Sequence, residues 1–330
     1  MTRCLLTEAI HPEGVARLEA AGLEVEQLPR AERGLLAEAL PRAEAAITRL
    51  LGLTAQEIAG AGRLRVIGKH GVGFDMIDVA AAARRGIPVV FTPGANARSV
   101  AEAALALLFA LARDLVPADR ALRAGEADYK RRARPRELAG LTLGVLGYGA
   151  IGSRLAGLAA ALGLRVEVWA RPERAAAIAA DGHRPIAGLD QLLARADAVS
   201  LHLPLTGETR GLISAERLAL MKPEAFLINT SRGGLVDEAA LAAALTAGRL
   251  AGAGLDDLTP EMATPGSPLL RAPNCLVSPH TAASTDGALK AMSLACVEQV
   301  LAVLEGRRPP HLAQPAVWPE GAPGPAPTAA

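Results

Sequence analysis

The stretch GVLGYGAIGSRLAGLAAALGLRVEVWA, residues 144–170, decides the fold class of this 330-residue chain. It predicts an apolar strand, a turn with the spacing Gly147-x-Gly149-x-x-Gly152, a helix and a second strand. The first glycine permits a tight turn, the second lets the backbone approach a pyrophosphate, and the third lets the helix pack closely on the strand. Glycine turns are common, so the motif alone is weak. Between a strand and a helix, however, it predicts a dinucleotide-binding βαβ unit.

Short apolar strands alternate with Ala- and Leu-rich helices on both sides of this unit, which is typical of a parallel α/β fold. The first lobe is complete by about residue 95, and a second series of strands and helices begins near residue 141. A long helix at 99–115 and an Arg-rich loop at 123–138 separate the two. Strands of the first lobe are predicted at 3–7, 24–28, 45–50, 64–68 and 87–93. After a last helix at 284–306, the proline-rich tail 307–330 has no periodic apolar pattern, which predicts disorder.

Composition excludes several classes of protein. The formal net charge is +1 and neither sign of charge accumulates in long runs, which argues against a nucleic-acid or anionic-membrane surface. No stretch approaches the ~20 uncharged apolar residues of a membrane span, and the N-terminus lacks the features of a signal peptide. The three cysteines have no paired spacing, so no metal site is expected. The sequence therefore predicts a soluble cytoplasmic protein.

Charged residues follow three predicted strands of the second lobe. Arg232 follows AFLIN (225–229), Glu261 follows a strand that ends at Asp256, and His280 follows NCLV (274–277). Each alone has a simpler explanation: an arginine in a turn, a glutamate flanking a helix, a histidine in the core. Ligands of open α/β sheets bind at the carboxyl ends of the strands, so the coincidence of all three predicts a site there.

The three side chains match the chemistry of 2-oxo acid reduction, in which a hydride reaches the carbonyl carbon and a proton reaches its oxygen. A histidine titrates near neutral pH and suits the proton donor. A neighbouring carboxylate, a role open to Glu261, would fix its tautomer. A guanidinium binds carboxylate and carbonyl oxygens through its planar fork, which suits Arg232.

At this point the chain resembles the D-isomer-specific 2-hydroxyacid dehydrogenases. The similarity covers nearly everything except the proline-rich tail. It rests on motifs in the order of that family: KHGVGFDMID (69–78), TPGANARSVAE (92–102), GYGAIG (147–152), LHLPLTGETRGLI (201–213), NTSRGGLVDEAAL (229–241), GLDDLTPE (254–261) and SPHTAAST (278–285). Two departures are Asp257, where valine is usual, and Met262, where proline is usual.

The resemblance implies a role for individual residues. Arg232, Glu261 and His280 match the catalytic positions of the family. Backbone N–H groups of Val72 and Gly73 would hold the substrate carboxylate, with Asn96 nearby. The glycine turn and the loops beyond it would bind the coenzyme, with Asp256 beside the nicotinamide. The implied coenzyme contacts are Gly147, Gly149, Ala150, Ile151, Gly152, Ala170, Arg171, Arg174, Leu203, Pro204, Thr209, Thr230 and Asp256.

The resemblance also implies the domain organisation. A flavodoxin-like substrate-binding lobe at 1–97, completed by the helix 286–306, would join a Rossmann-like dinucleotide-binding lobe at 98–285. Both lobes are α/β with parallel sheets, and the active site is expected in the cleft between them. Members of the family are commonly homodimers, so a homodimer is implied.

The substrate stays open between two classes. Lys69 and His70 precede the carboxylate-binding glycines, and this stretch looks like that of phosphoglycerate dehydrogenases. Lys69 is equally explained as a solvated residue at a strand end. Since no C-terminal regulatory domain follows, small acids such as hydroxypyruvate or glyoxylate are the first choice and 3-phosphoglycerate the second. A non-catalytic corepressor that senses the dinucleotide is a further alternative, which the intact catalytic trio disfavours.

The coenzyme preference depends on VEVWARPER (166–174). NAD-preferring sheets place an acidic side chain at the end of the second strand, where it binds the ribose hydroxyls. Counted along the resemblance, that position is Ala170, followed by Arg171 and Arg174. We therefore expect NADP(H) to be preferred, with NAD(H) possible. Glu173 argues against this preference, and solvation of a helix start would also explain the two arginines.

Overall fold

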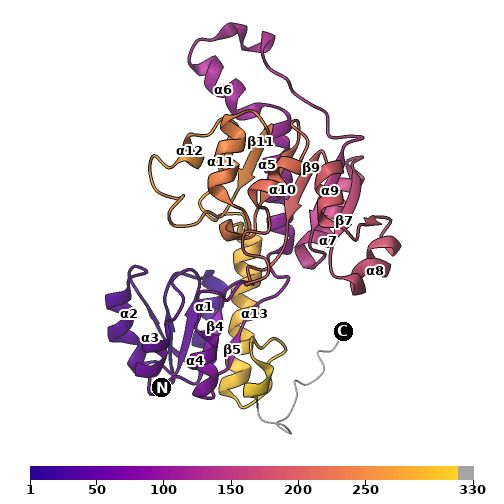
Figure 1. Ribbon diagram of the computed structural model, residues 1–330. Helices are drawn as coiled ribbons and strands as arrows, with labels where there is room; N and C mark the ends of the chain where they lie inside the picture. The colour runs from indigo at the N-terminus through magenta and orange to yellow at the C-terminus, as the bar shows by residue number, and fades with distance from the viewer. Residues whose placement is uncertain (319–330) are drawn as a thin grey trace. The chain divides into compact units, whose positions relative to one another are not determined.

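The computed structural model describes residues 1–318, and the chain divides into two compact units (Figure 1). The first unit consists of Met1–Asn96 and the described residues from Ser284 onward. The second is Ala97–Ala283. Each contains one parallel sheet with helices on both faces, so the predicted α/β fold with two Rossmann-like lobes is confirmed.

The first unit has a five-stranded sheet in the order β2-β1-β3-β4-β5, and every pairing is parallel. Its strands are β1 (Arg3–Leu6), β2 (Glu24–Gln27), β3 (Ala45–Thr48), β4 (Val66–Lys69) and β5 (Val89–Val90). Its helices are α1 (Pro12–Ala20), α2 (Arg33–Ala39), η1 (Leu40–Arg42), α3 (Ala55–Gly60), α4 (Val79–Arg84), α13 (Asp286–Leu304) and η5 (Pro315–Val317).

Successive residues of a strand point to opposite faces, and the core of this unit follows that alternation. Leu5, on one face, packs with residues of α2, α3 and α4. Leu6, on the other face, packs with residues of α1 and α13. The last helix therefore closes a sheet whose strands come from the first 90 residues.

Helix α13 is long and apolar enough to cross a membrane by length and composition alone. In the structure 56% of its apolar window is buried, and it packs on β4, β5 and α1. This burial is what a core helix requires.

The prediction of a disordered tail is wrong for residues 307–318. Leu312 forms an antiparallel bridge with Val90, and the Ala313 N–H donates to the Val89 carbonyl (2.8 Å). The side chain of Gln299 accepts from the His311 N–H (3.0 Å), and Trp318 packs against the core. These few apolar and amide groups attach a proline-rich segment to the sheet without any periodic pattern. The rest of the tail, 319–330, lies outside the described residues.

The second unit has a seven-stranded parallel sheet in the order β12-β11-β10-β9-β6-β7-β8. Its strands are β6 (Thr142–Leu146), β7 (Arg165–Trp169), β8 (Arg184–Pro185), β9 (Ala198–Leu201), β10 (Phe226–Asn229), β11 (Gly252–Leu255) and β12 (Cys275–Val277). Its helices are α5 (Ala97–Ala112), α6 (Leu115–Arg123), η2 (Ala127–Arg131), α7 (Ala150–Ala161), η3 (Pro172–Arg174), α8 (Ala175–Ala180), α9 (Leu189–Arg195), α10 (Ala215–Leu220), η4 (Gly233–Leu235), α11 (Glu238–Thr246) and α12 (Pro268–Arg271).

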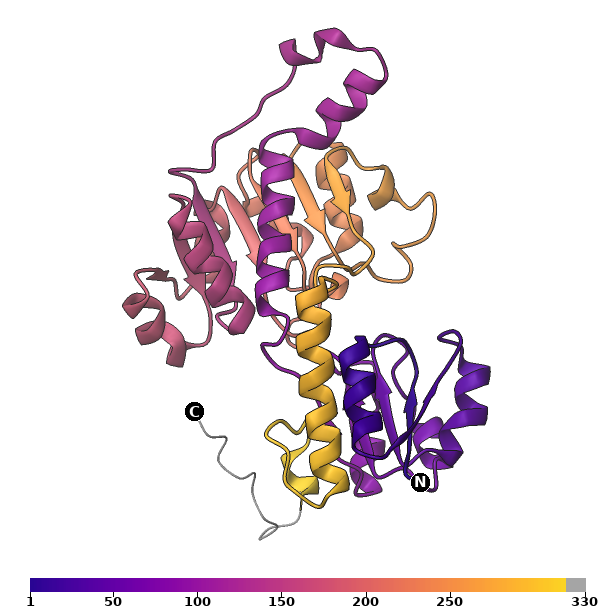
Figure 2. The same ribbon diagram turned by 180° about the vertical axis from the view of Figure 1, so that it is seen from behind.

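The strand order of this unit reverses at β6, which lies between β7 and β9. Helices α5 and α7 cover one face of the sheet, and α5 is seen crossing that face in Figure 2. Helices α9, α10 and α11 cover the other face. A reversal of strand order opens a crevice at the carboxyl ends of the strands, which is where ligands of such sheets bind.

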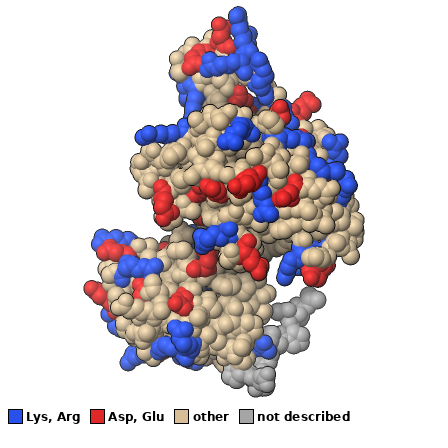
Figure 3. All heavy atoms as spheres, in the orientation of Figure 1, with Lys and Arg blue, Asp and Glu red and all other residues tan. Residues whose placement is uncertain are grey.

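Charged side chains of both signs are spread over the face of the molecule seen in Figure 3. Basic side chains gather at the segment of α6 and η2 at the top of that view. Helix η2 lies within the stretch predicted as an Arg-rich loop, 123–138, and α6 ends where that stretch begins. The hydroxyl of Tyr129, in η2, donates to the carboxylate of Asp114, the N-cap of α6 (2.5 Å), and ties η2 to the start of α6.

Candidate active site

The glycine turn connects β6 to α7 as predicted. Gly147 has a φ of 96°, and a Cβ there would lie 2.3 Å from the His202 carbonyl oxygen. A Cβ on Gly152 would lie 2.1 Å from the carbonyl oxygen of Gly147. Helix α7 begins at Ala150 with Gly149 as its N-cap, so no side chain caps its first N–H groups. The turn therefore fits a pyrophosphate, which would accept hydrogen bonds from those N–H groups.

The segment after β7 carries the two arginines of the predicted coenzyme site. Ala170 is half-buried, whereas Arg171 and Arg174 are exposed beside η3. Within residues 1–318, neither guanidinium forms an ion pair, although Glu173 is next to Arg174 and two residues from Arg171 in sequence. Both cations are thus available to an anionic ligand at this edge of the sheet.

Two further loops lie at the carboxyl ends of β9 and β10. After β9, the Thr209 hydroxyl donates to the Pro204 carbonyl (2.6 Å) and closes the loop that follows Leu203. After β10, the hydroxyl oxygen of Thr230 is buried and has no hydrogen-bond partner among the described residues. A buried hydroxyl without a partner is unfavourable unless a ligand or water satisfies it, so Thr230 fits the predicted coenzyme contact.

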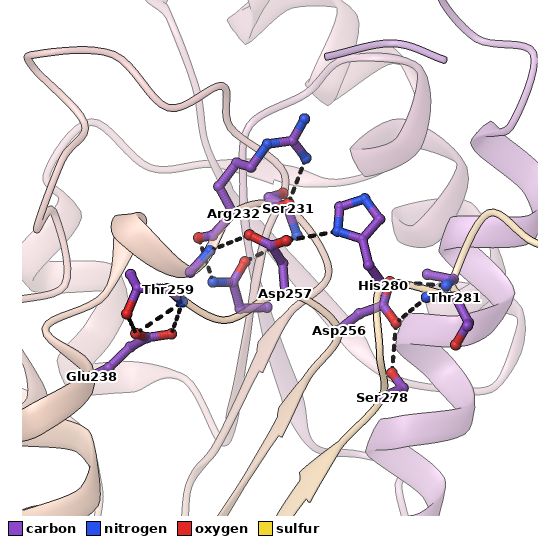
Figure 4. Close-up of polar contacts among 12 residues, drawn as sticks. Ser231, Arg232, Glu238, Asp256, Asp257, Thr259, Ser278, His280 and Thr281 are labelled. Carbon is purple, nitrogen blue, oxygen red and sulfur yellow. Dashed lines mark hydrogen bonds and ion pairs between the residues drawn. The ribbon is translucent and has the colours of Figure 1, made fainter. Parts of the chain in front are cut away.

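The buried side chain of Asn229, at the end of β10, shapes the turn that leads to Arg232. The Asn229 amide donates to the Arg232 carbonyl (2.8 Å), and its oxygen accepts from the Ser231 N–H (3.0 Å). The Ser231 hydroxyl donates to the Leu201 carbonyl at the end of β9 (2.7 Å). The Arg232 guanidinium donates to the Ser231 carbonyl (2.9 Å), so strand and turn together aim it (Figure 4).

Asp256 fastens the segment that carries His280. Its buried carboxylate accepts from the Ser278 hydroxyl (2.6 Å) and from the N–H groups of Thr281 and Ala282 (both 2.8 Å). Its carbonyl accepts from the His280 N–H (2.8 Å). His280 has a φ of 57°, a left-handed conformation that disfavours a residue with a side chain by roughly 1–2 kcal/mol. The hydrogen bonds to Asp256 hold it there. The predicted place of Asp256 beside the nicotinamide stays a prediction.

The carboxylate that contacts the His280 ring belongs to Asp257. Its Oδ1 lies 2.6 Å from His280 Nδ1, and its Oδ2 accepts from the Gly233 N–H (2.8 Å) (Figure 4). Burial alone would raise the pKa of Asp257. The hydrogen bonds from His280 and Gly233, with the charges of His280 and Arg232, outweigh burial and lower it. Asp257 is therefore an anion at neutral pH.

The structure does not place Glu261 where the sequence led us to expect it. The Glu261 side chain is exposed, and its carbonyl accepts from the Thr264 hydroxyl (2.8 Å). Among the described residues, the carboxylate within hydrogen-bonding distance of the His280 ring is that of Asp257. Asp257 is the second residue after the end of β11, whereas Glu261 lies in the turn beyond it.

Glu238 is a second carboxylate that sequence reasoning missed. It is 6% exposed at the start of α11 and accepts from the Thr259 N–H and hydroxyl. Burial raises the pKa of Glu238, and the hydrogen bonds from Thr259 oppose that rise. Glu238 thus ties the turn after Asp257 to the segment after Arg232. Its position beside Asp237, the N-cap of α11, made it look like an ordinary helix-start residue.

The predicted substrate-binding residues belong to the first unit. Val72 and Gly73 are half-buried after β4, and Asn96 is 9% exposed. The side-chain oxygen of Asn96 has no hydrogen-bond partner among residues 1–318, as expected of a group that contacts a ligand. Lys69 is buried, and its amine donates to the Arg49 carbonyl.

His70 is buried in the first unit and has a structural partner there. Its Nε2 lies 2.9 Å from the Ser293 hydroxyl, which also accepts from the His11 N–H (2.9 Å). That hydroxyl therefore has its hydrogen available for an unprotonated Nε2. Burial, and then the charges of Arg49 and Lys69, lower the pKa of His70 to about 4.

We expect the first unit to lose stability in mild acid because of His70. An unfolded histidine has a pKa of ~6.5, so between about pH 6.5 and about pH 4 the unfolded state binds more protons than the folded state. Above this window His70 does not lower the free energy of unfolding. As the pH falls through the window, the free energy of unfolding falls with it. From about pH 7 to about pH 5 the loss is about 2 kcal/mol. Urea unfolding of wild type and His70→Gln at both pH values measures it, with the exposed His311→Gln as control. An equal pH dependence in wild type and His70→Gln would contradict the assignment.

Comparisons with known proteins agree on one group of enzymes. The family model described as D-isomer specific 2-hydroxyacid dehydrogenase, NAD binding domain, matches residues 105–282. The D-3-phosphoglycerate dehydrogenase of Methanocaldococcus jannaschii is 38% identical over 310 residues, which are 93% of this chain and 58% of that protein. This chain therefore spans less than two thirds of that relative.

Two further relatives match over nearly their whole length. The glyoxylate reductase of Korarchaeum cryptofilum is 35% identical over 317 residues, or 94% of this chain and 95% of that protein. The solved structure of an NADPH-dependent glyoxylate/hydroxypyruvate reductase from Sinorhizobium meliloti has a TM-score of 0.83 and 30% identity. That match covers 97% of this chain and 99% of the other.

Proposed function

Because the chain belongs to the D-isomer-specific 2-hydroxyacid dehydrogenase family, we propose that it interconverts a small 2-oxo acid and its D-2-hydroxy acid with a nicotinamide coenzyme. One observation carries the proposal. Arg232 and His280 leave strands of one parallel sheet whose glycine turn fits a dinucleotide, and Asp257 contacts both segments. The resemblance supports a homodimer, and the composition supports a soluble cytoplasmic enzyme.

His280 is the proposed acid and base. Its Nδ1 faces a carboxylate, so Nε2 is the nitrogen that delivers a proton to the substrate oxygen during reduction and takes it back during oxidation. The coenzyme, when bound, supplies or accepts the hydride. Glu261 stays a prediction as the third catalytic residue.

Arg232 is the proposed substrate ligand. Its guanidinium binds the carboxylate and carbonyl oxygens through parallel N–H donors and stabilises the negative charge that develops on the carbonyl oxygen. In the first unit, the N–H groups of Val72 and Gly73 are the proposed ligands of the substrate carboxylate, with Asn96 beside them.

The proposed substrate is a small acid of the glyoxylate or hydroxypyruvate type. Lys69 and His70 were the candidates for binding a phosphate substituent. Both are buried and bonded within their own unit, to the Arg49 carbonyl and the Ser293 hydroxyl. Because both side chains already bind groups of the protein, an unphosphorylated substrate is favoured over 3-phosphoglycerate.

The proposed coenzyme is NADP(H). No carboxylate stands at Ala170 to repel a 2′-phosphate, and Arg171 and Arg174 are exposed without an ion pair in the described chain. A charge-assisted hydrogen bond contributes ~1.5–3 kcal/mol, or roughly ten- to 150-fold in preference.

Initial rates with glyoxylate, hydroxypyruvate and phosphohydroxypyruvate, each with NADPH and with NADH, test the substrate and the coenzyme together. We expect a higher kcat/KM with NADPH, and higher values for the two unphosphorylated acids. Arg171→Ala should erase most of the coenzyme preference, and Ala170→Asp combined with Arg171→Ala should reverse it. Arg249→Ala, an exposed arginine after α11, is the matched control. Equal or better efficiency with NADH in the wild type would contradict the assignment and make Glu173 the expected ribose ligand.

A further inference from the structure

Tyr148 lies between the first two glycines of the glycine turn, and its side chain connects the turn to another part of the second unit. The residue is 7% exposed, and its hydroxyl donates to the Asp181 carboxylate (2.6 Å). Its ring meets the His183 ring edge-on, with the centroids 6.2 Å apart. Burial, and then the bond to Asp181, raise the pKa of Tyr148, so the hydroxyl keeps its hydrogen at neutral pH. The glycine turn is therefore bonded to residues 181–183 through one side chain.

Asp181 stands near the end of the arginine segment, residues 170–183, which leaves the sheet after β7 and returns to it at β8. Within this segment η3 ends at Arg174, and α8 follows without a break and has Asp181 as its C-cap. At 1.5 Å per residue, about 10 Å of helix separates Arg174 from Asp181. Because a helix this short moves as one piece, the position of Asp181 governs the position of Arg174.

Helix α8 depends on its two ends for polar anchoring. It has the sequence AAAIAA, so no side chain within it can form a hydrogen bond. Its one large side chain, Ile178, is 1% exposed and belongs to the same core cluster as Tyr148. The helix lies at the outer edge of the second unit (Figure 1). The segment is bonded to the turn at its near end by the Gly147 N–H and the Trp169 carbonyl (2.8 Å), and at its far end by Tyr148 and Asp181.

We propose that Tyr148 is a positioning residue for coenzyme recognition, which holds the arginine segment at a fixed place relative to the glycine turn. The role rests on the proposed function, because it requires a dinucleotide that reaches from the turn to the segment. The turn binds the pyrophosphate in that proposal, and Arg171 and Arg174 bind the 2′-phosphate. A segment that is already fixed loses less entropy when the coenzyme binds, so the bond from Tyr148 raises coenzyme affinity without touching the coenzyme.

Tyr148→Phe tests this role, because it removes the hydroxyl and keeps the ring. We expect the affinity for NADPH to fall about three- to tenfold, since part of a hydrogen bond to a charged group is lost. NADH has no 2′-phosphate for the arginines, so its affinity should change by less than about twofold. Fluorescence titrations of the full chain with each reduced coenzyme, without a 2-oxo acid, measure both values.

Two further variants show whether the bond itself is responsible. Asp181→Ala removes the acceptor at an exposed position and should reproduce Tyr148→Phe, and it serves if that variant does not fold. The double variant should be no worse than either single one, because both remove the same bond. Tyr129→Phe is the matched control, since it breaks the other tyrosine–aspartate bond of this unit, to Asp114 (2.5 Å). It should leave both coenzyme affinities unchanged.

Hydrogen exchange followed by mass spectrometry provides a readout without coenzyme. In Tyr148→Phe the amides of residues 175–183 should exchange faster, whereas those of α7 should keep their wild-type rates. Unchanged exchange in 175–183, equal losses of NADPH and NADH affinity, no loss of either, or additive losses in the double variant would each overturn the role of Tyr148.

The proposed coenzyme can fail separately from the role of Tyr148. If the wild type prefers NADH, the assignment of NADP(H) is wrong and Glu173 becomes the expected ribose ligand. Glu173 lies on the same arginine segment, so the loss in Tyr148→Phe should then fall on NADH. An NADH-preferring wild type whose Tyr148→Phe variant keeps its NADH affinity would contradict both proposals.

Discussion

Replacing His280 with alanine should lower kcat for reduction of a 2-oxo acid by about 10²–10⁴-fold and leave coenzyme affinity nearly unchanged. The ring is the proton donor in the proposed reaction, and the glycine turn that fits the coenzyme lies at a different strand, β6. Steady-state rates and a fluorescence titration of the reduced coenzyme measure the two effects separately.

His311→Ala is the control for this variant, because His311 is an exposed histidine of the other unit. It should keep wild-type rates. A His280→Ala enzyme with near wild-type turnover would remove His280 from the mechanism. A selective loss of coenzyme affinity would make it a binding residue instead.

Replacing Arg232 with lysine should lower kcat/KM for the 2-oxo acid by about 10²–10³-fold, although the charge is retained. Lysine lacks the planar pair of donors that binds a carboxylate and its neighbouring carbonyl. Initial rates with varied 2-oxo acid at saturating coenzyme measure this loss.

Arg249→Lys makes the same change at an exposed position of the same unit and should have no effect. If the Arg232→Lys enzyme shows only a raised KM for the coenzyme, Arg232 binds a coenzyme phosphate and its role as substrate ligand is wrong.

The parts of the site that the sequence predicts are those built into local structure. Arg232, Asp256 and His280 were located by finding where apolar strands end, and β10, β11 and β12 are indeed neighbours in the sheet. The glycine turn is equally local, because its spacing requires the strand before it and the helix after it.

Local sequence could not decide whether Asp257 or Glu261 contacts the His280 ring. Asp257 and Glu261 are four residues apart, and either could reach a histidine on the next strand. The conformation of that turn depends on Glu238, 21 residues from Thr259, and on the bonds from Asp256 to residues 278–282. The only signal in the sequence was that Asp257 stands where the similar family usually has valine.

Burial of the expected phosphate-binding residues was also beyond sequence reasoning. His70 contacts Ser293 on α13, which is 223 residues away along the chain. The ordered part of the tail also depends on a contact with α13, because the side chain of Gln299 accepts from the His311 N–H. Neither contact has a pattern that periodicity or composition can reveal.

The configuration of the product formed from hydroxypyruvate tests the central claim most directly. The full chain is incubated with reduced coenzyme and hydroxypyruvate, and the glycerate is separated on a chiral column while coenzyme oxidation is followed. The proposed function predicts D-glycerate in amounts equal to the coenzyme oxidised, and its loss in His280→Ala. L-glycerate would contradict the assigned family activity. Coenzyme binding without oxidation by any 2-oxo acid would instead indicate a dinucleotide-sensing protein.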